Sequence, residues 1–475
     1  MFIGRQEQLD EMSLLWSKRV SSLVTCRGRR CIGKSTLIRR FAELSSARFI
    51  KIEGLRPRKE YGNIDELRTF ASQLAAQTGC ERTIPDDWLS AFIRLGREIR
   101  DDEKTVVLLD EISWLGYYDP TFADTLKIAW DNYWKPKDRL IVVLCGSVSS
   151  WIKENIIGNG EFMGRRSLDL IVNELPLADC VRFWGSHAQR LSSTEIFDVL
   201  SVTGGVPRYL EEVTPSLSAA DNIRRLCFSP KGVLREDFDD MFNDVITNQP
   251  RFTCDVLRTL VNGKLNVSEI ASALKIEKGG RLTDALKRLE ESGFVACDAS
   301  RDPETGEVIR EKSYRIKDNY SRFYLKFVEP SKDAIDGGAF DFGSLERLDG
   351  WSGIMGLQFE NLIVNNFRKL IPHLHLSGAL VTSAAPYRKV GRKGERCQID
   401  LLLQAKRFVY LVEIKRQREI GREVMSEVEQ KLSRLNLPDG VTARAALVYD
   451  GHLAPPVEAE GFFDSIVDAK SLLHD

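Results

Sequence analysis

Four short apolar runs alternate with longer segments of helical periodicity between residue 1 and about residue 170. The runs are Leu23–Cys26, Phe49–Ile52, Val106–Leu109 and Ile141–Cys145. Such alternation is typical of strands that are joined by crossover helices. It predicts an α/β fold in which a mainly parallel sheet carries helices on both faces.

Beyond residue 170 the pattern changes three times. Helical periodicity dominates about residues 175–245 and is interrupted at Gly204-Gly205-Val206-Pro207. A helix-rich unit with strand-like stretches follows at about 250–328, and the polar linker Pro330–Gly343 precedes a last αβ unit from about residue 345. A chain of 475 residues is too long for one hydrophobic core, so several domains are expected.

Composition narrows the class of protein. Hydrophobic residues make up 43% and charged residues 29%, as in ordinary globular proteins. The net charge of -1 excludes a uniformly basic nucleic-acid coat but leaves room for a local basic face. The nine cysteines are scattered without a Cys-x-x-Cys pair, and no secretory signal or membrane-spanning run is found. We therefore expect a cytoplasmic protein with no membrane association.

A phosphate-binding loop follows the first apolar run. Gly28-Arg-Arg-Cys-Ile-Gly33-Lys34-Ser35 matches G-x-x-x-x-G-K-[ST] between a strand and a helix. Lys34 is expected to reach the β- and γ-phosphates of ATP, and the Ser35 hydroxyl is expected to bind Mg²⁺. The nucleotide-binding residues predicted here are Gly28, Arg29, Arg30, Cys31, Ile32, Gly33, Lys34, Ser35 and Thr36.

Polar residues at the ends of two later strands complete the predicted ATPase site. Asp110 ends the third apolar run and is assigned to the metal, while Glu111 is assigned to the attacking water. Ser147 follows the fourth run and is a candidate γ-phosphate sensor or a simple turn residue. Arg165 or Arg166 is a candidate transition-state arginine, in cis or from a neighbouring subunit, or an ordinary surface residue.

Several motifs together resemble the archaeal-type AAA+ ATPases, which are related to the STAND group of signal-transducing NTPases. The motifs are Phe2–Leu9, the Gly-Arg-Arg phosphate loop, Asp110–Leu115, Gly146-Ser147, Gly164–Arg166 and Gly204–Leu210. The resemblance implies an ATP-hydrolysing AAA+ core with a helical lid, in which Pro207 approaches the nucleotide. It assigns the adenine pocket to four opening residues, which are Phe2, Ile3, Gly4 and Arg5.

Residues 256–316 have the pattern of a helix-turn-helix with a wing. The third predicted helix, Arg281–Ser292, carries three basic residues that could meet phosphates, Arg281, Lys287 and Arg288. Glu290 and Glu291 would repel them, so a winged helix that packs against protein is an equal alternative.

Carboxylates interrupt two apolar strands near the C-terminus. The stretches 398–403 and 408–415 predict a β-hairpin with its turn at Ala405-Lys406, which would place residue 400 opposite residue 411. Asp400 and Glu413 are then diagonal neighbours on one face, together with Lys415. Glu360 on a preceding helix is a further candidate ligand, and this set suits Mg²⁺ or Mn²⁺ that activates water.

This region resembles the DUF234 domain and the PD-(D/E)xK nuclease fold. The resemblance implies that Asp400, Glu413 and Lys415 are catalytic residues, with Ile399 in place of the proline of the motif. A salt-bridge network, or a nuclease fold kept only for binding, is the alternative. Five basic residues just upstream could guide a nucleic-acid backbone or form a solvated loop: Arg388, Lys389, Arg392, Lys393 and Arg396.

The resulting domain prediction has five parts. They are an ATPase core at 1–174, a helical lid at 175–248, a winged helix at 249–330, a linker at 331–344 and a DUF234 nuclease-like domain at 345–475. The leading hypothesis is an ATP-controlled protein that binds and cuts DNA, with homo-oligomers left open. The rival hypothesis is a STAND-like switch whose C-terminal domain binds nucleic acid or protein without cutting.

Overall fold

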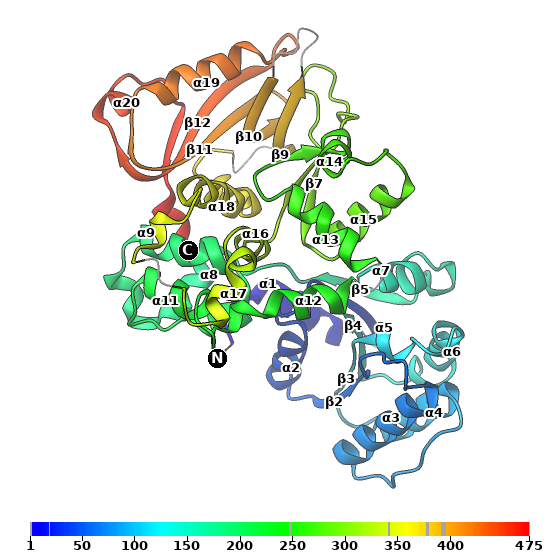
Figure 1. Ribbon diagram of the computed structural model, residues 1–475. Helices are drawn as coiled ribbons and strands as arrows, with labels where there is room; N and C mark the ends of the chain where they lie inside the picture. Colours follow the sequence, from blue (N-terminus) through cyan, green and yellow to red (C-terminus); the bar gives the residue numbers. More distant parts are fainter. Residues whose placement is uncertain are drawn as a thin grey trace. The chain divides into compact units, whose positions relative to one another are not determined.

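The protein is described by a computed structural model that covers residues 2–18, 20–147, 149–246, 249–340, 343–376, 380–390 and 396–474. Two compact units are present, residues 1–174 and residues 175–475 (Figure 1). Within the described ranges, no helix combines the length and apolar character needed to cross a membrane.

The N-terminal unit is built on a five-stranded parallel sheet in the order β2-β3-β4-β1-β5. Its strands are β1 Ser22–Arg27, β2 Arg48–Glu53, β3 Thr105–Asp110, β4 Leu140–Gly146 and β5 Arg166–Ile171. The predicted α/β class with a mainly parallel sheet is confirmed, and this sheet is typical of a P-loop NTPase core. Strand β4 lies between the strand that precedes the phosphate loop and the strand that ends in Asp110.

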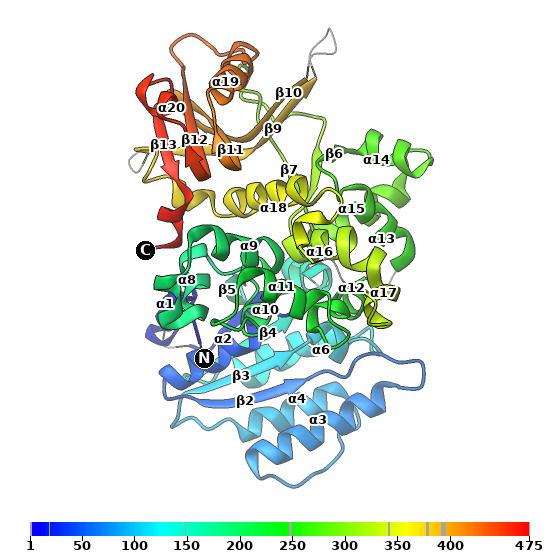
Figure 2. The same ribbon diagram turned by 60° about the vertical axis from the view of Figure 1, so that its left-hand side comes forward.

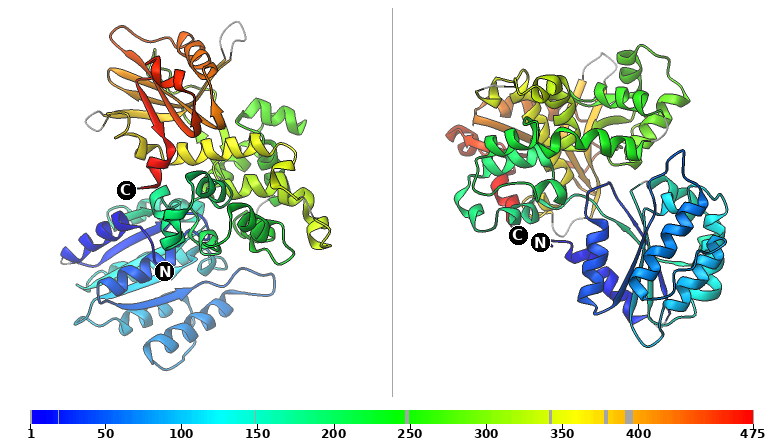
Figure 3. Two further views of the ribbon diagram at one scale, coloured as in Figure 1. Left: turned by 90° about the vertical axis from the view of Figure 1, so that its left-hand side faces the viewer. Right: turned by 60° about the horizontal axis from the view of Figure 1, so that its bottom comes forward.

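Helices cover both faces of this sheet, as the right-hand view of Figure 3 shows. They are α1 Gln6–Ser13, α2 Lys34–Leu44, α3 Asn63–Thr78, α4 Trp88–Glu98, α5 Ile112–Leu115, α6 Phe122–Ala129 and α7 Ser149–Ile152. One face packs its apolar residues, such as Ile50 and Leu109, against α3, α4 and α6. Helix α2 begins at the phosphate loop and buries Leu37, Ile38 and Phe41. The core therefore holds both ends of the loop in place.

The second unit begins with helices only. They are α8 Leu177–Val181, α9 Ser193–Thr203, α10 Pro207–Leu210, α11 Ala219–Cys227 and α12 Asp237–Val245. Three helices follow, α13 Pro250–Thr259, α14 Val267–Leu274 and α15 Gly280–Glu291. A small antiparallel sheet joins them, in the order β6 Leu265–Asn266, β8 Ser313–Ile316 and β7 Val295–Asp298. Helices α16 Asn319–Phe323 and α17 Lys332–Asp336 complete this stretch.

Residues 345–475, here called the C-terminal segment, carry a mixed five-stranded sheet in the order β13-β12-β11-β10-β9. Its elements are α18 Trp351–Asn365, β9 Val381–Val390, β10 Arg396–Ala405, β11 Phe408–Ile420, α19 Glu423–Ser433, β12 Thr442–Leu453, α20 Pro455–Ala459 and β13 Ser465–Asp468. Strands β9, β10 and β11 are antiparallel, and β11, β12 and β13 are parallel. Helices α18 and α19 cover opposite faces of the sheet (Figure 2).

The predicted hairpin exists, but its predicted register was wrong by two residues. The observed register pairs Leu401 with Val412 and Gln404 with Val409, so its continuation places residue 400 opposite residue 413. The turn consists of Lys406 and Arg407, both exposed, while Ala405 still belongs to β10. Two charged residues suit an exposed two-residue turn better than the partly buried alanine does. Asp400 and Glu413 are therefore direct rather than diagonal neighbours.

One hydrophobic core joins helices α8 and α9 to the C-terminal segment. Phe197 of α9 and Phe359 of α18 are fully buried, with ring centroids 5.1 Å apart at 90°. The same core includes Leu401 and Val412 of the sheet and Leu472 near the C-terminus. Such a continuous core makes these helices and the C-terminal sheet one packed body.

Buried polar groups reinforce this junction. The side-chain amide of Gln358 on α18 donates to the carbonyl oxygens of Ser201 at 2.7 Å and Asn319 at 2.6 Å. Near it, the Arg416 guanidinium of β11 pairs with Asp198 of α9 at 2.8 Å and with Asp450 of β12 at 3.1 Å. Breaking the Gln358 contacts would leave buried polar groups without partners, which costs more than the bonds contribute.

Candidate nucleotide site and C-terminal carboxylate cluster

The phosphate loop connects β1 to α2 through two glycines with positive φ. Gly28 has φ +156°, and a Cβ there would lie 2.2 Å from the carbonyl oxygen of Val172. Gly33 has φ +88° and directly precedes α2. Only glycine accepts both conditions easily. The N-terminus of α2 and the loop amides together are suited to a phosphate group.

Lys34 and Ser35 open helix α2. The Lys34 ammonium group, on a residue only 6% exposed, donates to the carbonyl oxygens of Gly28 and Arg29, both at 3.0 Å. The Ser35 hydroxyl donates to Asp110 Oδ2 at 2.6 Å. Thr36 is exposed on the next position of the helix. The lysine thus lies inside the loop that is expected to hold the phosphates.

The carboxylate of Asp110 is shared by three groups. It accepts from Ser35, it pairs with the ammonium group of Lys51 at 3.0 Å, and its other oxygen accepts from the Glu111 amide at 3.2 Å. A hydroxyl and a carboxylate at hydrogen-bond distance are the donor set that Mg²⁺ takes in P-loop proteins. Ser35 and Asp110 therefore fit a magnesium ion, which would neutralise charge on the phosphates when bound.

Glu111 and Ser147 contact each other at the ends of β3 and β4. The Ser147 hydroxyl donates to both oxygens of Glu111, at 3.0 and 2.8 Å, and the Ser147 amide donates at 3.3 Å. Glu111 adopts left-handed backbone angles, with φ 47°. A serine at this strand end can therefore set the direction of the carboxylate that is predicted to polarise water.

Three other predicted ATPase residues, Arg5, Arg165 and Pro207, lie in different parts of the protein. Arg5 lies beside the phosphate loop, because its guanidinium donates to the carbonyl oxygen of Ile32 at 3.1 Å. Arg165 forms a bidentate pair with Asp131, at 2.7 and 2.9 Å, which lowers the pKa of that carboxyl. Pro207 begins α10 in the second unit, and its approach to the nucleotide stays a prediction.

Lys51 was missed by sequence reasoning. It lies on β2, two residues before the exposed Glu53, which the ammonium group also contacts at 2.7 Å. Burial lowers the pKa of Lys51, but its bonds to Glu53 and Asp110 raise it and prevail. The available signal was a lysine inside the apolar run Phe49–Ile52. A cation in such a run is costly unless an anion meets it.

The C-terminal carboxylates lie together on β10, β11 and α18. Asp400 is half-buried at an irregular part of β10, and its carboxylate accepts from the Ile414 amide at 3.0 Å. Loss of water around this carboxyl, followed by the negative charges of Glu360 and Glu413, raises the pKa of Asp400 to about 7. Glu413 is 1% exposed. The three carboxylates therefore repel one another and require cations nearby.

Lysines supply these cations. Lys415 lies 3.2 Å from Glu413 and 2.7 Å from Glu427. Lys431 of α19 pairs with Glu413 at 2.5 Å, and Lys264 pairs with Glu360 at 2.6 Å. Within the described ranges, no group of three or more His, Cys, Asp or Glu side chains is arranged to hold a metal ion. The metal predicted here stays a prediction.

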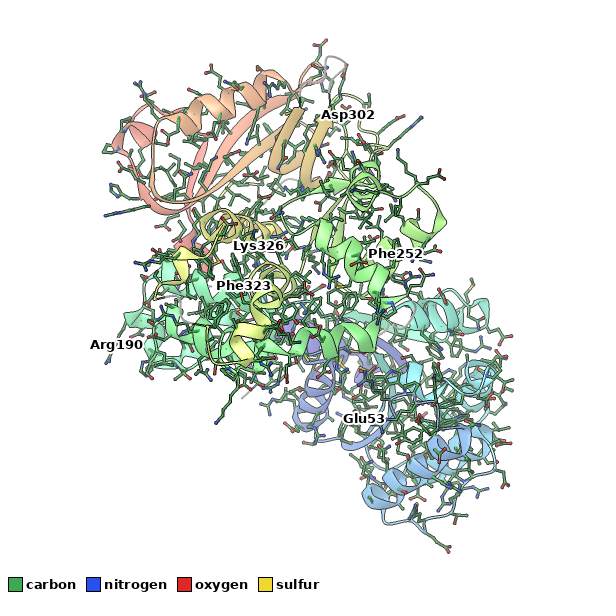
Figure 4. The ribbon with its side chains drawn as sticks, in the orientation of Figure 1. Glu53, Arg190, Phe252, Asp302, Phe323 and Lys326 are labelled. Atoms are coloured by element: carbon green, nitrogen blue, oxygen red, sulfur yellow. The ribbon has the colours of Figure 1, made fainter. Side chains whose placement is uncertain are left out.

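Basic residues upstream of β10 are partly engaged within the protein. Arg388 forms a bidentate pair with Glu269 of α14, with both distances 2.6 Å. Lys389 pairs at 2.7 Å with Asp302, which is labelled in Figure 4. Arg392 and Lys393 lie outside the described residues. These two ion pairs connect β9 to α14 and to the segment that precedes β8. They also neutralise positive charge that could otherwise bind a DNA backbone.

The third helix of the middle stretch offers a mixed surface. Arg281, Asp284, Lys287 and Glu290 of α15 are exposed, and Arg288 is half-buried. The Arg281 guanidinium lies 3.9 Å from the ring centre of Phe252 and donates to Gln249 at 2.8 Å. Alternating charge does not favour phosphate binding over packing against protein.

Comparison with known proteins finds a family match for residues 2–213. Residues 2–213 match the family described as an ATPase domain predominantly from Archaea. This match, the sheet order and the geometry at Lys34, Ser35 and Asp110 support a P-loop ATPase domain in this part of the chain.

Individual relatives are distant. An uncharacterized protein of Methanocaldococcus jannaschii is 23% identical over 367 residues, which span 76% of each chain. A Walker-type ATPase of Pyrococcus abyssi is similar in structure, with a TM-score of 0.50, 18% identity and coverage of 69% of this chain and 96% of that chain. The ORC2 protein of Aeropyrum pernix gives a TM-score of 0.41 and 15% identity, covering 71% of this chain and 95% of that chain.

Proposed function

We propose that this protein is an ATP-hydrolysing switch whose lid helices carry the nucleotide state to a C-terminal segment that binds DNA without cutting it. The observation that carries the absence of cutting is the pairing of Glu360 and Glu413 with Lys264, Lys415 and Lys431. Ammonium groups at these positions supply the charge that a metal ion would supply in a nuclease.

The ATPase chemistry is assigned to residues of the N-terminal unit. Lys34 neutralises the β- and γ-phosphates after it leaves the carbonyl oxygens of its own loop. Glu111 polarises the attacking water, and Ser147 holds the Glu111 carboxylate in position before ATP arrives. Ser35 and Asp110 would hold Mg²⁺. Arg165 is the candidate transition-state arginine, and it has to leave Asp131 to act.

The shared core supports the transmission step. Helices α8 and α9 belong to the predicted lid, and their buried residues pack on α18 and the C-terminal sheet. A lid helix that moves with the nucleotide state would move this sheet as well, because packed cores shift as bodies rather than deform. The Gln358–Ser201 bond and the Arg416–Asp198 pair add directional contacts to the same junction.

Finer assignments within the second unit accompany this proposal. Residues 249–330 are proposed to be a winged helix, on the strength of three helices joined to a small antiparallel sheet. Residues 345–475 are proposed to be a DUF234 nuclease-like domain, on the strength of Asp400, Glu413 and Lys415 on adjacent strands. The lid at 175–248 and the linker at 331–344 complete the proposed division.

One assay tests the binding role. Labelled duplex and supercoiled plasmid are incubated with Mg²⁺ or Mn²⁺, and with ATP, ADP or no nucleotide. We expect retarded migration at low salt that weakens as salt rises, and intact strands in every lane. Nicking that disappears in Asp400→Ala, but persists in the matched exposed variant Asp439→Ala, would contradict the proposal.

Metal-dependent DNA cleavage is the second candidate, and the environment of Asp400 favours it. Loss of water around this carboxyl, followed by the negative charges of Glu360 and Glu413, raises the pKa of Asp400 to about 7. A divalent cation would relieve that repulsion, with Asp400, Glu413 and Glu360 as ligands and Lys415 orienting water. Lys431→Met would then free one Glu413 oxygen, and Mn²⁺ binding measured by calorimetry should become tighter. Unchanged Mn²⁺ binding in Lys431→Met speaks against the cleavage candidate.

A further inference from the structure

Lys51 contacts Asp110, which together with Ser35 is the pair proposed to hold Mg²⁺. The ammonium group of Lys51 lies 3.0 Å from Asp110 Oδ2, the same oxygen that accepts the Ser35 hydroxyl at 2.6 Å. A second carboxylate, that of Glu53, holds the ammonium group from the other side at 2.7 Å. Glu53 is labelled in Figure 4. Lys51 is thus shared between a carboxylate inside the site and one outside it.

Strand register explains how Lys51 reaches Asp110. Strands β2 and β3 are parallel, with Glu53 opposite Asp110 and Lys51 opposite Leu108. Residues 51 and 53 share one face of β2, because side chains alternate along a strand. The long side chain of Lys51 runs along this face toward the strand end, where both carboxylates lie. Only 6% of the Asp110 side chain is exposed, so water screens this contact weakly.

We propose that Lys51 is a positioning residue that neutralises Asp110 in the nucleotide-free protein and competes with Mg²⁺ for it. Mg²⁺ then has to displace or share this ammonium group, so Lys51 sets the magnesium concentration that nucleotide binding requires. Glu53 weakens the competition because it holds Lys51 from outside. This inference rests on ATP binding at the phosphate loop, and it adds a determinant of metal affinity to that site.

Removing the charge of Lys51 and removing the charge of Glu53 should shift the Mg²⁺ midpoint in opposite directions. Lys51→Met removes a positive charge next to a cation site and should lower the Mg²⁺ midpoint by about three- to tenfold. Glu53→Gln frees Lys51 to pair with Asp110 alone and should raise the midpoint. Lys51→Arg keeps the charge and should leave the midpoint near that of the wild type.

Equilibrium binding measures these midpoints without turnover. A fluorescent, non-hydrolysable ATP analogue is titrated with Mg²⁺ in the full-length protein and in Lys51→Met, Lys51→Arg and Glu53→Gln. A midpoint in Lys51→Met that is unchanged or higher overturns the proposal. If Lys51→Met fails to fold, the Glu53→Gln variant tests the proposal instead. Glu53 is exposed, so this variant should fold, and its Mg²⁺ midpoint has to be higher than that of the wild type.

The same titration separates this inference from the ATPase assignment. A protein that binds no analogue at any Mg²⁺ concentration has no functional phosphate loop, and both conclusions fail. A protein that binds the analogue with one midpoint in all variants keeps the ATPase assignment and loses only the role of Lys51.

Discussion

Truncation of one ring in the C-terminal segment should loosen a helix of the predicted lid. Phe359 of α18 packs edge-to-face on Phe197 of α9, and both rings are fully buried. Phe359→Ala should cost about 3–5 kcal/mol through lost burial and the cavity that remains. The edge-to-face contact accounts for about 0.5–1.5 kcal/mol of that cost.

Amide hydrogen exchange read by mass spectrometry reports this loss segment by segment. Amides of α9 that exchange through opening of this core should exchange about 10²- to 10⁴-fold faster in Phe359→Ala. The matched control Phe92→Ala removes a fully buried ring from the N-terminal unit and should leave α9 unchanged.

The double variant Phe197→Ala/Phe359→Ala completes a cycle. Because the two side chains share one contact, the double loss should be smaller than the sum of the single losses by about 0.5–3 kcal/mol. Unchanged exchange of α9 in Phe359→Ala, together with additive losses, would refute the idea that the lid helices and the C-terminal sheet form one body.

Two further predictions concern the N-terminal unit. Lys34→Ala should abolish binding of a fluorescent ATP analogue. Glu111→Gln should retain binding and lower the turnover rate, measured as phosphate release, by at least about 10²-fold. Equal turnover in wild type and Glu111→Gln would remove Glu111 from the mechanism. Glu66 is 1% exposed, and burial raises its pKa from 4.5 to about 7, so its contribution to stability is complete below about pH 4.5 and is lost as the pH rises through about 7. Glu66→Gln should therefore stabilise the protein at about pH 8 by up to about 3 kcal/mol and flatten its thermal melting profile between about pH 5 and 8, and a variant that keeps the wild-type pH profile would exclude Glu66 as the cause.

The sequence predicts four of the five strands of the N-terminal sheet, including β2 at one edge, and misses β5 at the other edge. Strands β1, β3 and β4 are buried on both faces and read as continuous apolar runs. Strand β5 lies at the edge of the sheet beside β1 and contains Arg166 and Asp169, so it lacks that signal. Its first residue, Arg166, also belongs to the Gly164–Arg166 motif, which was interpreted as a source of a transition-state arginine rather than as the start of a strand.

Site residues were predictable where a local motif places them. The phosphate loop and Asp110-Glu111 are read from consecutive residues and the strand before them, and Ser147 from a strand end. Contacts that depend on register or on distant segments were not predictable. Lys51 meets Asp110 only through the pairing of β2 with β3, and Lys264 meets Glu360 across 96 residues of sequence. The hairpin register failed because two adjacent residue pairs could each form the turn.

The central claim is that the nucleotide state of the phosphate loop reaches the C-terminal segment. Hydrogen exchange of the full-length Glu111→Gln variant, saturated with ATP or with ADP in Mg²⁺, tests it most directly. We predict that protection changes together in α9, α18 and the buried strands β11 and β12, because these elements share one core. Changes that stop within residues 2–174, with α9 and α18 identical in both nucleotides, would contradict the account.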